Sequence, residues 1–232
     1  MPDSPRNDLL RNLYIRQWSA LQEVAAGGAD ISAPYLAWVH PDYEQADIKL
    51  VVVGKETNGW GERSLAGRGS SEAVDILMRE YQDFQLGTHY RGRASFWTPV
   101  HELYRRLNPT GPTLGFVALN ASVVDQDGST PNADVRSALI RTGLLPEEIR
   151  ILEPNVVVFH TGPEYETWLD GWFPGLNRVG DAWLARLAAT GLPALSFRTY
   201  HPRYLNYRSE RSAIYDRIED AVHRGVQAAD EA

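Results

Sequence analysis

Cysteine is missing from the chain, and methionine occurs only twice. The absence of cysteine excludes disulfides, thiolate nucleophiles and zinc or iron–sulfur sites that depend on cysteine ligands. Long apolar runs are also missing, since no stretch approaches the ~20 residues of a membrane-spanning helix. The polar N-terminal sequence MPDSPRNDLL does not resemble a secretory signal. We therefore expect a cytoplasmic protein without a membrane partner.

Basic residues are outnumbered by acidic ones, 23 to 30, which gives a net charge of −7. This balance argues against a surface coated with basic groups, although a local basic patch would still attract phosphates. The 232 residues, 43% hydrophobic and 23% charged, suit one large domain with a sizeable core. We expect a single domain over residues 1–232, with an N-terminal helical extension at about residues 1–30.

Four short apolar runs predict the strands of a buried parallel sheet. They cover residues 48–53, 114–120, 155–160 and 194–198. Apolar residues at helical spacing predict helices near residues 7–26, 70–86, 96–107, 133–142, 146–152 and 208–226. The connection between the third and fourth strands holds several aromatic residues, which we interpret as packing residues. Strands that alternate with helices predict an α/β fold, with a central parallel four-stranded sheet covered on both faces.

Polar side chains follow each predicted strand at the point where it ends. The first strand leads into G-K-E-T-N at residues 54–58, and the others lead to Asn120, His160 and His201. Ligands of open α/β sheets bind outside the carboxyl ends of the strands, so we expect a cleft there. Two alternatives remain: Asn120 could cap the next turn, and His160 could be a hydrogen-bonded strand-end histidine.

Several familiar chemistries are excluded by their missing motifs. The chain has no G-x-x-x-x-G-K-[ST] phosphate loop, no H-E-x-x-H and no G-x-S-x-G. The segment after the first strand lacks the middle glycine of a dinucleotide fingerprint. Asp125 and Asp127, next to Gly128, lack the later glutamate of a calcium loop, and we predict that they are turn residues.

The order of these motifs over residues 48–210 resembles the uracil-DNA glycosylase superfamily. That family's first motif follows a buried strand as G-Q-D-P-Y-H, G-I-N-P-G or G-E-A-P-G, where this chain has G-K-E-T-N. Its second strand ends in L-N, as at Leu119-Asn120, and its third strand resembles residues 156–159. Its last motif, H-P-S-P-L-S, is H-P-R-Y-L-N here, at residues 201–206. Threonine replaces the proline of the first motif, and arginine and tyrosine replace the serine and proline of the last.

The resemblance implies a three-layer α/β/α fold and hydrolysis of an N-glycosidic bond, which releases a damaged or deaminated base from DNA. It assigns a catalytic carboxylate to Glu56, with Asn58 beside it, and a donor to the leaving base to His201. Asn120 would read the base edge, because an amide offers both a donor and an acceptor. The reaction needs no metal or cofactor.

The resemblance also predicts contacts around the reacting nucleotide. Lys55, Trp60 and His160 would contact the base or the substrate, with Trp60 as the candidate stacking aromatic. Leu205 would fill the gap left by an extruded nucleotide. Phosphates would be held by the four arginines Arg198, Arg203, Arg208 and Arg211.

Other functions fit the same residues. The arginines could form a solvated helix start that pairs with Glu210 and Asp216. A hydrolase of small nucleosides or nucleotides would need less basic surface and fits the net charge of −7. A catalytically silent member of the fold could bind nucleic acid or protein.

Overall fold

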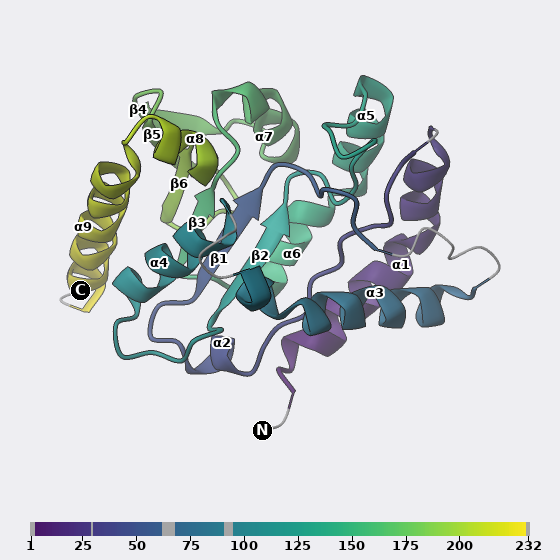
Figure 1. The fold of residues 1–232 in the computed structure, drawn as a ribbon, viewed down its shortest axis with the longest axis horizontal. Helices are drawn as coiled ribbons and strands as arrows, with labels where there is room; N and C mark the ends of the chain where they lie inside the picture. The colour runs from purple at the N-terminus through teal and green to yellow at the C-terminus, as the bar shows by residue number, and fades with distance from the viewer. Residues whose placement is uncertain (1–2, 29, 62–67, 91–94, 231–232) are drawn as a thin grey trace.

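The computed structural model of the chain describes residues 3–28, 30–61, 68–90 and 95–230 (Figure 1). Its helices are α1 (Arg6–Ala26), α2 (Asp42–Gln45), α3 (Ser70–Phe84), α4 (Trp97–Leu107), α5 (Ala133–Thr142), α6 (Leu144–Leu152), α7 (Glu166–Trp172), α8 (Pro202–Tyr207) and α9 (Arg211–Asp230). Two 3-10 helices are η1 (Gln85–Tyr90) and η2 (Pro163–Tyr165). The strands are β1 (Leu50–Gly54), β2 (Phe116–Asn120), β3 (Val156–Phe159), β4 (Asn177–Gly180), β5 (Leu184–Ala188) and β6 (Leu195–Thr199).

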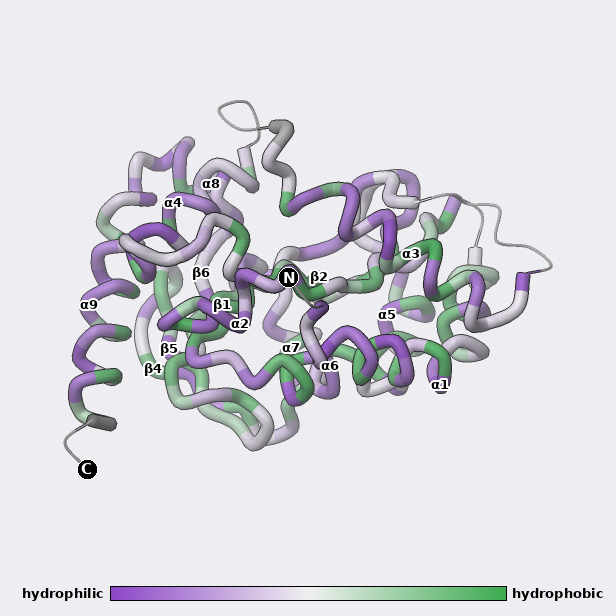
Figure 2. Tube along the Cα trace, turned by 90° about the horizontal axis from the view of Figure 1, so that it is seen from below, coloured by the Kyte–Doolittle hydropathy of each residue, from purple (hydrophilic) through white to green (hydrophobic). Residues whose placement is uncertain are grey.

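The strands form one six-stranded sheet in the order β2-β1-β3-β6-β5-β4. The pairs β1–β2, β1–β3 and β3–β6 are parallel, which places the ends of β1 and β2 side by side. Both faces of β1 are covered, so each of its residues is buried. In both views α4 lies on one side of the sheet and α6 on the other (Figures 1 and 2). The chain is therefore a mixed α/β protein, as its alternating pattern predicts.

The prediction of a four-stranded sheet is wrong, because β4 and β5 extend it with an antiparallel hairpin. This hairpin lies in the stretch that we expected to be an aromatic connection. Strand β4 is largely exposed and β5 mixes buried and exposed residues, so neither has the apolar run that marks the four parallel strands. The turn of the hairpin is held by Asp181, whose Oδ1 accepts the N–H groups of Trp183 (2.8 Å) and Leu184 (2.9 Å).

Edge strand β2 is protected by a side chain of α3. The Tyr81 hydroxyl accepts the Ala118 N–H at 2.9 Å and donates to the Ala118 C=O at 3.1 Å. One hydroxyl thus satisfies both backbone groups that point away from the sheet at this position. In the described ranges, no helix combines the length and apolar character needed to cross a membrane.

The N-terminal helix α1 is an integral part of the core. Its buried stripe includes Leu10, Tyr14 and Leu21 at helical spacing, and it contacts α3, α5 and α6. Residues 1, 2 and 29 of the expected extension lie outside the described residues. Helix α1 is joined to α6 by the buried Tyr14 hydroxyl, which donates to Glu148 Oε1 at 2.7 Å and accepts the Ala37 N–H at 3.1 Å.

Burial raises the pKa of Glu148 from its ordinary value of 4.5 to about 8, although the bond from Tyr14 opposes this shift. Between these values the folded protein keeps a proton that the unfolded chain releases. Stability therefore falls as the pH rises through this window, by at most about 1.4 kcal/mol per pH unit.

We predict that Glu148→Gln removes this component of the pH dependence, because glutamine cannot ionise while its carbonyl can still accept from Tyr14. Urea unfolding at several pH values between about 5 and 8 gives the free energy of unfolding of both proteins, and hence its slope against pH for each. Identical slopes would show that Glu148 is not the titrating group.

Candidate functional site

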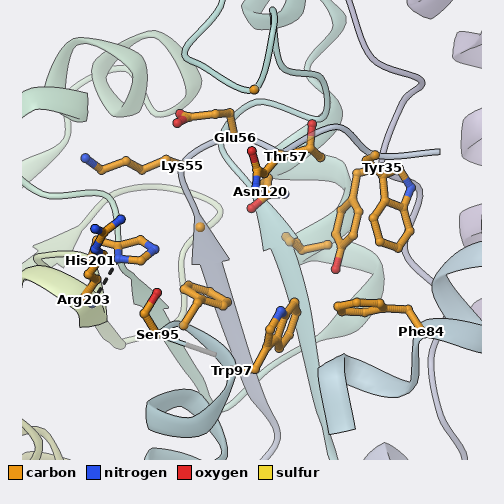
Figure 3. A pocket seen from close by; sticks show the side chains of 17 residues that line it. Tyr35, Lys55, Glu56, Thr57, Phe84, Ser95, Trp97, Asn120, His201 and Arg203 are labelled. Carbon is orange, nitrogen blue, oxygen red and sulfur yellow. Dashed lines mark hydrogen bonds between the residues drawn. The ribbon is translucent and has the colours of Figure 1, made fainter. Parts of the chain in front are cut away.

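A cleft of about 690 Å³ opens at the carboxyl ends of β1 and β2. Its walls come from segments far apart in the sequence, which include the loop after β1, the end of β2, the end of α3, the start of α4 and the start of α8. They contain Tyr35, Gly54, Lys55, Glu56, Thr57, Asn58, Trp60, Phe84, Ser95, Phe96, Trp97, Ala118, Leu119, Asn120, Gly128, His201 and Arg203. In Figure 3, Lys55, His201 and Arg203 lie on one side, and Tyr35 and Phe84 on the other.

His201 is the N-cap of α8, where its Nδ1 accepts the Arg203 N–H at 3.1 Å (Figure 3). A backbone N–H can only donate, so the neutral imidazole carries its hydrogen on Nε2. Burial, followed by the positive charges of Lys55 and Arg203, lowers the pKa of His201 to about 4. The histidine is therefore a neutral side chain at pH 7, with Nε2–H as its donor.

The carboxylate of Glu56 is held by two hydroxyl groups. Glu56 Oε2 accepts from Tyr165, and also from Thr130 at 3.2 Å. Burial, together with the bond to Glu56, raises the pKa of Tyr165, so its hydroxyl stays a donor. Neighbouring Lys55 forms an ion pair with Glu164 and lies 5.6 Å from the centroid of the Tyr165 ring. Residues of η2 thus fix both side chains.

The loop after β1 is anchored by the fully buried Asp125. Its Oδ2 accepts from the Thr57 hydroxyl at 2.5 Å and from the Gly59 N–H at 2.8 Å. Its Oδ1 accepts the Gly128 N–H at 2.8 Å. Burial by itself would raise the pKa of Asp125, but the bonds from Thr57, Gly128, Gly59 and Ser32 lower it below its usual range. Asp125 therefore anchors the loop after β1, in addition to the turn role predicted for it.

Glycine at position 54 leaves room for the amide of Asn120. The two residues are register partners at the ends of β1 and β2. A Cβ at position 54 would lie 2.4 Å from Asn120 Oδ1, which is closer than any real contact of this kind. The Asn120 side chain therefore lies across the end of β1 and lines the cleft there.

An unbroken series of ring contacts runs along the cleft. It links Tyr35 to Trp60 (4.7 Å between centroids), Trp60 to Phe84 (5.3 Å), Phe84 to Trp97 (5.0 Å), Trp97 to Phe96 (5.1 Å) and Phe96 to His201 (5.4 Å). Most of these rings meet edge to face, the arrangement that aromatic quadrupoles favour. The predicted Trp60 belongs to this aromatic wall, and it is one ring among several.

Sequence reasoning missed Tyr35, Phe84, Phe96 and Trp97 as cleft residues. The adjacent aromatics Phe96 and Trp97 at the start of α4 were the available signal, because one face of a helix cannot bury both. Tyr35 and Phe84 reach the cleft through packing between distant segments, which no local spacing reveals.

The structure brings together Lys55, Glu56, Asn58, Trp60, Asn120, His201 and Arg203. His160 does not line the cleft: it is completely buried, its Nδ1 lies 3.3 Å from the Tyr200 carbonyl oxygen, and burial lowers its pKa to about 3. Substrate contact by His160 is thus not supported, whereas the alternative of a strand-end histidine agrees with this position.

Three residues of the predicted nucleic-acid surface are engaged elsewhere. Arg198 is buried and donates to Glu166 at 2.9 Å and to the Ala182 carbonyl oxygen at 2.6 Å, so it cannot hold a phosphate. Leu205 is completely buried and cannot fill a gap in DNA. Arg211 pairs with Glu102 at 3.1 Å.

The two remaining arginines of this surface, Arg203 and Arg208, are exposed. Among the described residues, the alternative partners Glu210 and Asp216 form no ion pair with these two arginines. Asp216 pairs with Arg106 instead.

Within the described residues, His, Asp and Glu side chains nowhere gather in a group of three or more that could hold a metal ion. No protein-family model matches the chain, and no curated protein matches it either. The geometry of the cleft is therefore the basis for assigning a function.

We predict that Asp125→Asn destabilises the protein by about 1–3 kcal/mol, because its amide NH₂ faces N–H donors that are then left without an acceptor. Asp127→Asn is the matched control, since Asp127 is exposed with φ of 52°, a conformation that asparagine tolerates.

The lowered pKa of Asp125 determines how its contribution to stability changes with pH. The contribution of Asp125 is present above its ordinary value of 3.8 and is lost as the pH falls through the lower pKa of the folded state. Urea unfolding at pH 7 and near pH 3 should show a smaller difference between Asp125→Asn and wild type in acid. An equal loss of stability from Asp125→Asn and Asp127→Asn would contradict the role of Asp125 as the anchor of this loop.

Proposed function

We propose that this protein is a DNA-base N-glycosidase related to the uracil-DNA glycosylase superfamily, with a three-layer α/β/α fold of that type. The observation that carries the proposal is the convergence of Glu56, Asn120 and His201. These side chains follow three different strands and line one cleft. They supply the carboxylate, the amide and the neutral donor that release of a base requires.

Glu56 is the group that stabilises the sugar. As the N-glycosidic bond lengthens, the sugar becomes cationic, and a nearby carboxylate lowers the energy of that state. Two hydroxyl donors on one oxygen of Glu56 hold the carboxylate in place before the reaction begins. Its other oxygen can orient the attacking water and accept the proton that the water loses as its oxygen bonds to the sugar, while the released base anion takes a proton from solvent.

His201 acts on the departing base. The base leaves with the electron pair of the broken bond, so negative charge develops on its carbonyl oxygen. The Nε2–H of neutral His201 donates to that oxygen, while Lys55 and Arg203 add positive potential nearby. A neutral imidazole is a weak acid, so it stabilises the base anion by hydrogen bonding without transferring a proton.

The remaining walls would recognise the base. Asn120 offers a donor and an acceptor to its edge, and the aromatic wall provides faces on which it can stack. Burial among rings also excludes water, which strengthens each polar contact inside the cleft. These features support binding of a planar heterocycle with at least one carbonyl group.

Hydrolysis of a free nucleoside or nucleotide is the second candidate. The observation in its favour is the engagement of Arg198 and Arg211 by Glu166 and Glu102, which leaves a smaller basic surface than predicted. The same catalytic residues would serve either substrate. Comparing base release from an oligonucleotide and from the matching nucleoside distinguishes the two.

We predict that Glu56→Gln lowers the single-turnover rate of base release about a hundredfold or more, because it removes the charge that faces the sugar. His201→Ala should cost ~10²–10⁴-fold. Oligonucleotides carrying uracil, hypoxanthine, xanthine or mismatches serve as substrates, with abasic sites as the readout.

Glu147→Gln is the matched control, because Glu147 lies on α6 in a surface ion pair with Arg150. If wild type releases no base from any of these oligonucleotides or nucleosides, the proposal of an N-glycosidase fails.

We also predict that the ratio of the wild-type rate to the His201→Gln rate stays constant between about pH 5.5 and 8. The pKa of about 4 keeps His201 neutral over this interval, so its donor does not change. Single-turnover rates for both proteins at each pH give the ratio. A change with a midpoint near the ordinary histidine value, about 6.5, would contradict a neutral donor.

A further inference from the structure

The exposed side chains of helix α8 and its C-cap include Arg203, Tyr204 and Tyr207, with Arg208 at the C-cap and Asn206 between the tyrosines. The two arginines and two tyrosines carry the charge and the rings of this surface. We call them the α8 face. Tyr207 is 81% exposed and Tyr204 is 41% exposed, and both are among the exposed large hydrophobic residues of the described chain. Pro202 and Leu205, three residues apart, bury the opposite side of the helix.

Tyr204 rests on a fixed stack of rings. It is stacked on Trp183 with 6.0 Å between centroids and 20° between planes, and it contacts Tyr200 at 4.7 Å. Trp183 comes from the turn of the β4–β5 hairpin, and it also contacts Tyr200 at 5.2 Å. The Tyr204 ring is thereby held in one orientation while part of it stays open to solvent.

Positive charge flanks the two tyrosines. Among the described residues, neither Arg203 nor Arg208 has a carboxylate within ion-pair distance, whereas Arg198, Arg211 and Arg217 each have one. On a helix, residues three and four positions apart are neighbours. Arg203 therefore lies beside Tyr207, and Tyr204 lies beside both Tyr207 and Arg208.

The dimensions fit a nucleic-acid strand. A rise of 1.5 Å per residue places Tyr207 about 6 Å along the helix from Arg203, which itself lines the cleft. This is about the length of two stacked nucleotides at 3.4 Å each. A strand that leaves the cleft along α8 would meet an arginine and an aromatic face at each of its first steps.

We propose that the α8 face binds single-stranded nucleic acid beside the cleft, with flanking bases stacked on Tyr204 and Tyr207 and phosphates held by Arg203 and Arg208. The inference rests on the proposed function only in taking nucleic acid as the ligand. Aromatic rings with interleaved basic groups are typical of single-strand binding, because unpaired bases expose their faces and duplex bases do not. Because Leu205 is buried, the described part of the α8 face has no aliphatic wedge to open a duplex.

The test uses fluorescence anisotropy with two labelled probes of equal length, a twelve-nucleotide oligo(dT) and the same backbone without bases. We expect Tyr207→Ala to weaken binding of oligo(dT) about tenfold, within the range for one stacked base, and to leave the abasic probe unaffected. Tyr207→Phe should bind like wild type, because it keeps the ring, whereas Tyr207→Leu should behave like the alanine variant.

Val179→Ala is the control for a general effect of surface apolar groups, since Val179 is 67% exposed on β4. Arg208→Gln should reduce the slope of log affinity against log salt by about 0.7, the value for one phosphate of a single strand. Its effect should be the same on both probes, because the phosphates are present in both.

Neither probe contains a damaged base, so the result does not depend on catalysis. Tyrosine-dependent binding of oligo(dT) would support this inference even if no base is released. In that case only the proposed N-glycosidase function would fail. The inference would be overturned, whether or not base is released, if Tyr207→Ala weakened binding of both probes equally. Tighter tyrosine-dependent binding to the same oligo(dT) annealed to oligo(dA) would also overturn it. A wild-type protein that binds neither probe would also overturn it, and docking of a protein would then be the use of the α8 face.

Discussion

The cleft depends on the buried carboxylate of Asp125. An ionised group without water around it is costly unless donors surround it, and here Thr57, Gly59 and Gly128 provide them. Rotating any of these donors away would leave a charge unsatisfied in the interior. The loop after β1 is therefore held in one conformation, and Glu56, between β1 and the anchored Thr57, is placed by the same constraint.

The surroundings of each side chain, more than its identity, decide what it can do in this cleft. His160 and His201 both follow strands, and burial lowers the pKa of each. His160 lies beneath the surface between Phe96 and Tyr215, whereas His201 caps α8 and faces the cavity. The same neutral imidazole is a core residue in the first case and an available donor in the second. The tyrosines also differ in their surroundings: Tyr165 is buried and donates to Glu56, whereas Tyr207 is exposed to solvent.

The sequence was sufficient for the parallel part of the sheet and for three of the four strand ends at the cleft, because buried apolar runs such as residues 50–53 have few other uses. It did not reveal the β4–β5 hairpin, since β4 is an exposed edge strand and β5 mixes buried and exposed residues, so neither carries such a run. Side-chain direction was the other limit. Arg198 pairs with Glu166 from α7, a partner 32 residues away that no spacing could indicate. The aromatic wall, with His201 at its end, likewise assembles from five separate segments.

The burial of Leu205 shows how a short helix determines which side chains a surface exposes. An extended segment after His201 would leave Leu205 free to project, but Pro202 at the first helical position and the His201 cap start α8 instead. Helical spacing then turns Pro202 and Leu205 inward together. Exposing Leu205 again would cost about 1.5–3 kcal/mol of burial as well as the helix itself. The exposed side chains that can meet a ligand include Arg203, Tyr204, Tyr207 and Arg208, which favour stacking and charge contacts over insertion into a duplex.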